Sequence, residues 1–335
     1  MSATTMTIAG RPTIRMGLGL MSLTLHQTVE ESTAFEVIKT ALDSGANLIN
    51  TAMFYGSPED KLSNLRLLGN FFKKYPEYIE NAIVSVKGGM VGTFAGCTGD
   101  IDVLRKELQT ARELLGGKEI DIFATARLPD DRPWEETVHN LMTLQKEGLF
   151  RTIGLSETGV ESMKLAHNLA GDLVSSNEIE VSLQTLSDPA ISETIKIAKE
   201  LGIVIIGYSP FGHGLLNGQF DIKEMEKNGH DWRNFLPRFQ GDNLNKNLKL
   251  VTELKELSKH YDRTLVELVL ASLNKYSSNI LPLPGSINPI KVAQNSAAAK
   301  VVITDEELYA ILKIVQENPV EGTRYPEVGM GSLMK

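Results

Sequence analysis

The sequence of 335 residues contains one cysteine, Cys97. An intramolecular disulfide and a metal site built from several cysteines are therefore excluded. No apolar run approaches the length of about 20 residues that spans a bilayer, and the first residues lack the apolar core of a signal peptide. The last residues match no anchor or retention signal. We therefore expect a cytoplasmic protein with no membrane segment.

Positive charge and glycine-rich phosphate motifs are also scarce. The net charge is −8, which argues against nucleic acid or an anionic membrane as the main partner. Neither G-x-G-x-x-G after a first strand nor G-x-x-x-x-G-K-[ST] occurs, and the short GLGL at 17–20 does not replace them. A Rossmann-type dinucleotide site is therefore not expected.

The chain does contain eight short apolar runs that alternate with segments of helical periodicity. The runs cover residues 15–18, 48–51, 82–86, 120–124, 152–155, 179–183, 203–208 and 280–282. Continuous apolar runs are typical of parallel strands buried on both faces. Eight such units favour a (β/α)8 TIM barrel in a single domain, residues 1–335, over an open doubly wound sheet.

Two segments fall outside this repeat. The polar stretch 211–246 is long for a loop in a compact domain, and such loops are usually functional. From about residue 304 a C-terminal helix and tail are expected, with Thr304 and Glu307 forming a capping box.

Residues at the strand ends suggest chemistry, because the active sites of such barrels lie there. Tyr55 follows the second strand in NTAMFYG, and Lys87 ends the third in AIVSVKGG. A nearby ammonium stabilises phenolate and lowers the pKa of a tyrosine, which can then protonate a carbonyl oxygen. Taken singly, Tyr55 also fits a surface aromatic and Lys87 a lysine that reaches solvent past apolar neighbours.

Five motifs in this order, NTAMFYG, SVKGG, GLSE, GYSPFGHGLLNG and LPLPGS, resemble the aldo-keto reductases. The resemblance covers nearly the whole chain. It implies a (β/α)8 barrel that uses NADPH without a Rossmann fold and without a metal, acting on a small-molecule aldehyde.

The family's catalytic Asp, Tyr, Lys and His are matched only in part. Tyr55 and Lys87 agree, but Asn50 stands at the aspartate position and Ala126, followed by Arg127, at the histidine position. Asn50 can accept a hydrogen bond from Lys87 but brings no charge. We therefore expect Lys87 to be less neutralised and to lower the pKa of Tyr55 further. The missing histidine removes a donor to the carbonyl and leaves room for a bulkier ring.

These departures resemble one branch, the yeast pyridoxal reductases, as do MGLGLMSLT, FFKKYPE and PFGHGLL. That branch implies NADPH-dependent reduction of pyridoxal to pyridoxine. Two alternatives stay open: a general reductase of other aldehydes, and a non-catalytic NADPH-binding regulatory subunit similar to the potassium-channel β subunits.

The resemblance also implies cofactor contacts. Tyr208 would stack on the nicotinamide, Ser156 and Glu178 would bind the carboxamide, and Lys291 would hold the 2′-phosphate where the family often has arginine. The full set is Gly19, Met21, Ser156, Glu178, Tyr208, Ser209, Phe211, Gly212, Ser286, Lys291, Gln294 and Asn295.

The alternatives for Tyr208 and Lys291 are a core tyrosine and an exposed helix lysine. Arg238, in the long loop, is expected to be a phosphate clamp, part of a lid or a surface charge. Phe54, Arg127 and Trp232 are candidates for the substrate pocket.

Overall fold

Eight parallel strands form one sheet that closes into a barrel in the computed structural model, which describes residues 4–25, 29–92, 96–228 and 231–335. Neighbouring strands follow each other in chain order, and a parallel bridge between Gly19 and Gly285 joins the last strand to the first. The strands are β3 (Gly17–Gly19), β4 (Leu48–Ala52), β5 (Ile83–Gly88), β8 (Ile122–Thr125), β9 (Thr152–Ser156), β10 (Val174–Glu180), β11 (Val204–Tyr208) and β12 (Ile280–Leu283). The predicted (β/α)8 barrel is confirmed.

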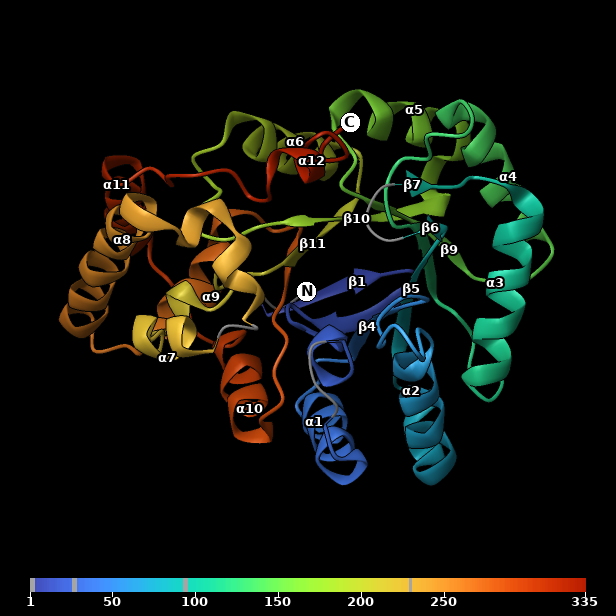
Figure 1. Ribbon diagram of the computed structural model, residues 1–335, viewed down its shortest axis with the longest axis horizontal. Coiled ribbons are helices and arrows are strands. Elements are labelled where there is room, and N and C mark those ends of the chain that lie inside the picture. Colours follow the sequence, from blue (N-terminus) through green and yellow to red (C-terminus); the bar gives the residue numbers. More distant parts are fainter. Residues whose placement is uncertain (1–3, 26–28, 93–95, 229–230) are drawn as a thin grey trace.

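Helices surround this barrel, as Figure 1 shows. Those of the repeat are α1 (Glu31–Asp43), α2 (Ser63–Lys74), α3 (Ile101–Leu114), α4 (Trp134–Lys146), α5 (Val160–Ala170), α6 (Pro189–Glu200), α9 (Leu265–Tyr276) and α10 (Pro289–Ala298). Additional ones are α7 (Ile222–Lys227), α8 (Gly241–His260), α11 (Asp305–Glu317) and α12 (Glu327–Met330). Short 3-10 turns are η1 (Met21–Leu23), η2 (Pro76–Tyr78), η3 (Gly171–Leu173), η4 (Leu215–Asn217), η5 (Trp232–Phe235) and η6 (Pro237–Phe239).

The start of α11 agrees with the prediction from the sequence, and the start of α8 does not. The capping box at Thr304 and Glu307 that opens α11 is confirmed. Helix α8 begins at Gly241, inside the stretch 211–246 that was expected to be a loop. Within the described ranges, no helix is long and apolar enough to cross a membrane.

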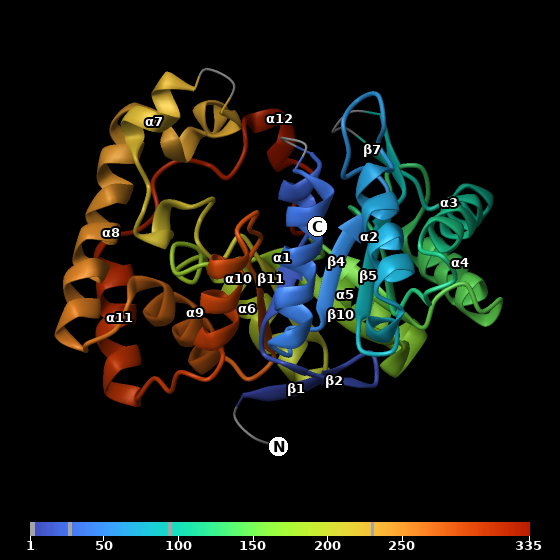
Figure 2. The same cartoon turned by 90° about the horizontal axis from the view of Figure 1, so that it is seen from below.

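A hairpin that the sequence analysis missed closes the lower end of the barrel. Strands β1 (Thr5–Ile8) and β2 (Arg11–Ile14) are antiparallel, and their two-residue turn, Ala9–Gly10, has φ of 50° and 73°. Such left-handed turns match the twist of paired strands. Met6 and Ile8 pack on an apolar layer inside the barrel that includes Leu48. Figure 2 shows the hairpin at this end and α12 at the other. A second small hairpin pairs β6 (Met90–Val91) with β7 (Gly96–Cys97).

The position of β10 corrects the sixth predicted strand. The apolar run at 179–183 was taken for the strand, but pairing covers Val174–Glu180. Side chains alternate between the two faces of a strand. Since Ile179 packs in the outer core with the helices, Glu178 and Glu180 point into the barrel. Glu178 therefore lies within the interior and pairs in register with Ser156 of β9.

Candidate active site

Polar side chains replace the apolar layer at the upper end of the barrel. Leu48 and Ile83 belong to the inner apolar layer, so alternation along β4 and β5 turns Asn50 and Lys87 inward as well. Tyr55 follows β4, and its ring centre lies 5.0 Å from the Lys87 ammonium. The structure thus brings together the three residues that the sequence proposed as catalytic.

A carboxylate from the far side of the barrel completes this group. Lys87 Nζ donates to Asn50 Oδ1 at 2.6 Å and to Glu178 Oε1 and Oε2 at 2.8 and 2.9 Å. Asn50 Nδ2 donates to Glu178 Oε2 at 2.7 Å. The expectation that Lys87 lacks a negative partner is therefore wrong: the charge missing from position 50 is supplied by Glu178. Because both Glu178 oxygens are engaged, its expected role as a carboxamide acceptor is less well supported.

The pKa values follow from burial and from these neighbours. Burial would lower the pKa of Lys87, but the charges of Glu178 and Tyr55 raise it overall, so the ammonium persists. Burial raises the pKa of Tyr55; Lys87 opposes the rise and Glu178 adds to it. The expected lowering of the Tyr55 pKa is thus also wrong for this arrangement. Tyr55 is held as the neutral phenol, the form that can donate a proton.

The histidine position of the family is filled by a small residue beside a cation. Ala126 is fully buried, and its N–H donates to Gly88 O at 2.9 Å. Arg127 is partly buried, and its Nη1 donates to the Ala126 carbonyl at 2.6 Å. Burial would lower the pKa of Arg127, but its interactions with groups that include Tyr208 and Tyr55 raise it. Phe54 packs edge to face on Tyr55, with ring centres 5.3 Å apart.

Tyr208, at the end of β11, is fixed through its hydroxyl. It donates to Glu157 Oε1 at 2.7 Å, and Glu157 Oε2 accepts from Arg324 Nη1 at 2.7 Å. Glu157 follows β9, is fully buried, and has φ of 50°. A left-handed conformation at a residue other than glycine is strained, and such strain gathers at functional sites. Ser156 precedes it and is 4% exposed.

The loop after β11 holds the next group of predicted cofactor residues. Ser209 has φ of 51°, and its hydroxyl lies 3.2 Å from His213 Nδ1. Gly212 has φ of 53°, and a Cβ there would lie 2.1 Å from the Gln184 side chain, so another residue would be strained and would require Gln184 to move. Phe211 packs against the outer core. Trp232, in η5, packs edge to face on His213 with ring centres 4.8 Å apart, which places it with this loop.

The predicted phosphate grip at α10 differs from expectation. Asn288, not Ser286, caps the helix, and its side chain accepts from the N–H groups of Ile290 and Lys291. The first helical residue, Pro289, has no N–H to offer. Binding of a 2′-phosphate would therefore depend on side chains. Lys291 and Gln294 are exposed and Asn295 is buried.

Three predicted residues remain: Gly19, Met21 and Arg238. Gly19 ends β3 and donates through its N–H to Pro284 O at 3.1 Å. Met21 opens η1 directly after it. Arg238 is neither a surface charge nor a free phosphate clamp, because it is buried and donates to both Glu180 oxygens at 3.2 Å.

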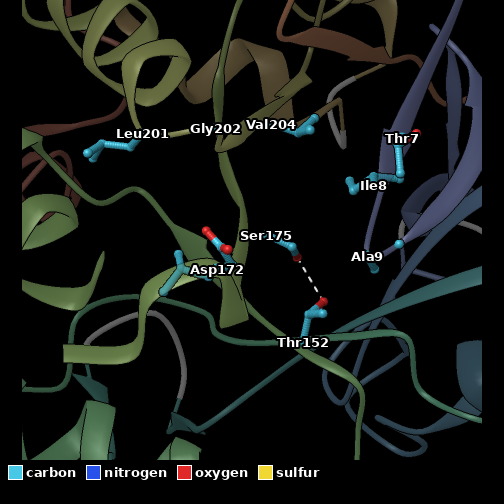
Figure 3. A pocket seen from close by; sticks show the side chains of 11 residues that line it. Thr7, Ile8, Ala9, Thr152, Asp172, Ser175, Leu201, Gly202 and Val204 are labelled. Carbon is cyan, nitrogen blue, oxygen red and sulfur yellow. Dashed lines mark hydrogen bonds between the residues drawn. The ribbon is translucent and has the colours of Figure 1, made fainter. Parts of the chain in front are cut away.

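A hollow of about 220 Å³ lies at the other end of the barrel. Figure 3 shows its lining, which includes Thr7 of β1 and Ser175 of β10. Ser175 and Thr152 share a hydrogen bond of 2.8 Å across it. It lies beside the hairpin and is separate from Tyr55 and Lys87.

The contact between Glu157 and Arg324 was not predicted from the sequence. They lie 167 positions apart in the chain, and no local pattern joins them. The buried, left-handed Glu157 has no sequence signal beyond its place after a strand.

Comparison with known proteins agrees with the fold and the motifs. A profile of the aldo/keto reductase family matches residues 15–316. The chain is 31% identical over 317 residues to "Probable pyridoxal reductase 2" of Schizosaccharomyces pombe, covering 92% of this chain and 94% of that protein.

Solved structures of low sequence identity share the barrel. A glycerol dehydrogenase from Gluconobacter oxydans superposes with a TM-score of 0.83 at 22% identity, covering 96% of this chain and 98% of that one. An aldo/keto reductase from Klebsiella pneumoniae in complex with NADP and acetate gives 0.69 at 16% identity, with coverage of 96% and 98%. These likenesses concern the fold, whereas the profile and the fission-yeast relative concern the sequence. On that evidence, the chain belongs to the aldo/keto reductase family.

Proposed function

We propose that this protein is an NADPH-dependent carbonyl reductase and that its substrate is pyridoxal, which it reduces to pyridoxine. The observation that carries the proposal is the contact of half-buried Tyr55 with the buried group of Lys87, Glu178 and Asn50. The ring centre of the neutral Tyr55 phenol lies 5.0 Å from the Lys87 ammonium, which stays charged. Membership of the aldo/keto reductase family supports the reaction class.

The chain's own residues divide the proton chemistry among them. When bound, the nicotinamide cofactor supplies a hydride to the carbonyl carbon. Tyr55 donates its phenolic proton to the carbonyl oxygen as negative charge develops there. The Lys87 ammonium stabilises the resulting phenolate, and Glu178 balances the lysine charge in the resting site. Asn50 holds Lys87 and Glu178 in register through one hydrogen bond to each.

Four residues support the choice of a nicotinamide cofactor in this proposal. Tyr208 offers an aromatic ring whose hydroxyl is anchored away on Glu157, which suits a stacking role. Ser156 lies on the neighbouring strand, in register with Glu178. The tight turn at Gly212 allows close backbone approach to a pyrophosphate. Lys291 is the exposed cation that would favour NADPH over NADH.

The substrate assignment rests on two residues that follow β8 and on one relative. Ala126 has a smaller side chain than the histidine of the family, and Arg127 interacts electrostatically with Tyr55. A guanidinium has five N–H groups, and the recorded bond to Ala126 uses one of them. The fission-yeast relative carries the name of a pyridoxal reductase. A reductase of other aromatic aldehydes is the coarser form of the same proposal.

The test is turnover by the purified protein. NADPH oxidation is followed with pyridoxal, with simple aromatic and aliphatic aldehydes, and with NADH in place of NADPH, and the product is identified by chromatography. We expect one pyridoxine formed per NADPH consumed and slower turnover of the simple aldehydes. NADPH binding without reduction of any aldehyde would contradict the proposal.

A further inference from the structure

The C-terminal segment, residues 318–335, is attached to the candidate active site through one buried arginine. Arg324 is 6% exposed. Its Nη1 donates to Glu157 Oε2 at 2.7 Å and lies 3.3 Å from the Tyr208 hydroxyl. Its Nε lies 2.7 Å from Glu180 Oε2. Figure 1 shows the segment leaving α11 and ending beside α5.

Main-chain contacts hold this segment on both sides of Arg324. Asn247 of α8 accepts from the Glu321 N–H and donates to the Glu321 carbonyl, both at 2.9 Å. Gly322 has φ of +88°, and a Cβ there would lie 2.8 Å from the main chain of Pro237. At the far end, the Gly159 N–H donates to Lys335 O at 2.7 Å. The segment therefore crosses from α8 to the start of α5 in close contact.

Arg324 supplies the cation in direct contact with both buried carboxylates beneath the segment. Glu157 and Glu180 are both fully buried. Arg238 neutralises Glu180 from the loop after β11, at 3.2 Å. His213 lies near the same carboxylate, but burial lowers its pKa to about 4, so it is neutral at pH 7. Glu157 is in direct contact with Arg324 and also interacts electrostatically with Arg127. Loss of Arg324 removes the direct ion pair of a buried carboxylate, which is unfavourable.

The hydroxyl of Tyr208 is tied to the same carboxylate. Burial, and next the charge of Glu157, raise the pKa of Tyr208 well above its ordinary value, so its O–H remains a donor. Arg324, Glu157 and the Tyr208 ring thus form a continuous chain of contacts from the C-terminal segment to the end of β11.

We propose that Arg324 is a positioning residue for Tyr208: through Glu157 it holds the ring against which the nicotinamide packs, so that docking of the C-terminal segment and binding of the cofactor support each other. This rests on the proposed nicotinamide site at Tyr208. Coupling between two sites is reciprocal. Bound NADPH therefore slows release of the segment, and a docked segment strengthens NADPH binding.

The experiment is a double-mutant cycle read by fluorescence titration with NADPH. Arg324→Gln removes the cation, Tyr208→Phe keeps the ring but loses the hydroxyl, and the double variant carries both changes. We expect Arg324→Gln to raise the Kd for NADPH by about tenfold, and by clearly less in the Tyr208→Phe background, as for residues in one network. Hydrogen exchange of the Glu321 amide, which donates to Asn247, should quicken in Arg324→Gln and slow again with NADPH.

Two further variants complete the experiment, one as a control and one as a substitute for Arg324→Gln. Lys335→Gln removes the ion pair with Asp130, 3.5 Å long, at the exposed end of the same segment, and should leave the Kd unchanged. If Arg324→Gln does not fold, Gly322→Ala displaces the segment through its positive φ while keeping every charge, and should weaken NADPH binding in the same direction.

The outcomes separate the two proposals. Wild-type Kd in both Arg324→Gln and Gly322→Ala, or independent and additive effects of Arg324→Gln and Tyr208→Phe, would overturn the positioning role alone. Absence of NADPH binding by the wild type would overturn the proposed function and this inference together.

Discussion

Lys87 of β5 and Glu178 of β10 face each other across the barrel interior, with the lysine Nζ 2.8 and 2.9 Å from the two carboxylate oxygens. Both side chains are almost completely buried. The pair gives the lysine its counter-charge although position 50 carries an amide. The charge of Lys87 is therefore balanced although position 50 has no carboxylate, because the carboxylate of Glu178 comes from another strand.

The first prediction concerns this relocated charge. Glu178→Gln leaves Lys87 as an uncompensated buried cation, and loss of one partner of a buried pair destabilises a protein by about 3–5 kcal/mol. Moving the carboxylate, in the double variant Asn50→Asp with Glu178→Gln, should restore most of that stability, because Asn50 Oδ1 already lies 2.6 Å from Lys87 Nζ. Urea unfolding followed by circular dichroism measures both changes.

A surface pair provides the control for this measurement. Glu147, directly after α4, pairs with Arg105 of α3 at the surface, and Glu147→Gln should leave stability almost unchanged. If Glu178→Gln were as stable as the wild type, Glu178 would not be the counter-charge of Lys87.

The second prediction concerns pH. Reduction requires Tyr55 as the phenol, which is populated below its pKa and lost above it. Because burial raises that pKa above the ordinary 10.0, the rate of aldehyde reduction should stay level through neutral pH and fall only above about pH 10. The quantity to measure is kcat/KM for the aldehyde against pH under saturating NADPH. A fall in kcat/KM of the wild-type protein centred below pH 9 would contradict a raised pKa of Tyr55.

The third prediction concerns the choice of cofactor. Pro289 and the cap Asn288 leave little main-chain donor capacity at the start of α10, so under the proposed function Lys291 would carry the preference for a 2′-phosphate. Lys291→Ala should weaken NADPH binding by about tenfold, on the scale of one charge-assisted contact, while NADH binding stays the same. Lys300, exposed just beyond α10, serves as the matched control in Lys300→Ala. Equal losses for NADPH and NADH would argue that Lys291 does not contact the 2′-phosphate.

The fourth prediction concerns Arg127. Its guanidinium interacts electrostatically with Tyr55 and takes the place next to the missing histidine. Arg127→Met should lower kcat/KM for pyridoxal by about 10²- to 10³-fold, the range that one donor to a developing oxyanion contributes, with an unchanged Kd for NADPH. Arg105→Met, on the exposed face of α3, is the control. A normal kcat/KM in Arg127→Met would exclude Arg127 from the substrate pocket.

The barrel could be predicted from the sequence because most of its strands are continuous apolar runs buried on both faces. β10 breaks that rule. Its inward residues Ser176, Glu178 and Glu180 are polar, since they serve the interior site. A search for apolar runs therefore placed the predicted strand too late, at residues 179–183. The hairpin of β1 and β2 was missed because each strand has only four residues, although Gly10 marks its turn.

The catalytic group was predictable in its members but not in its electrostatics. Asn50 and Lys87 lie in two adjacent strands and Tyr55 follows the first of them, so topology alone brings them together. The partner of Lys87 comes from a strand three positions further round the barrel, and Arg324 reaches Glu157 from the end of the chain. Such contacts depend on closure of the whole barrel, and no local spacing encodes them.

The most direct test of the account is single-turnover NADPH oxidation with pyridoxal by the wild type and by Tyr55→Phe, with the NADPH Kd measured for both. If Tyr55 is the proton donor, the phenylalanine variant binds NADPH as the wild type does but oxidises it about 10²- to 10⁴-fold more slowly. Equal oxidation rates in the two proteins would contradict the assignment of Tyr55 as the proton donor.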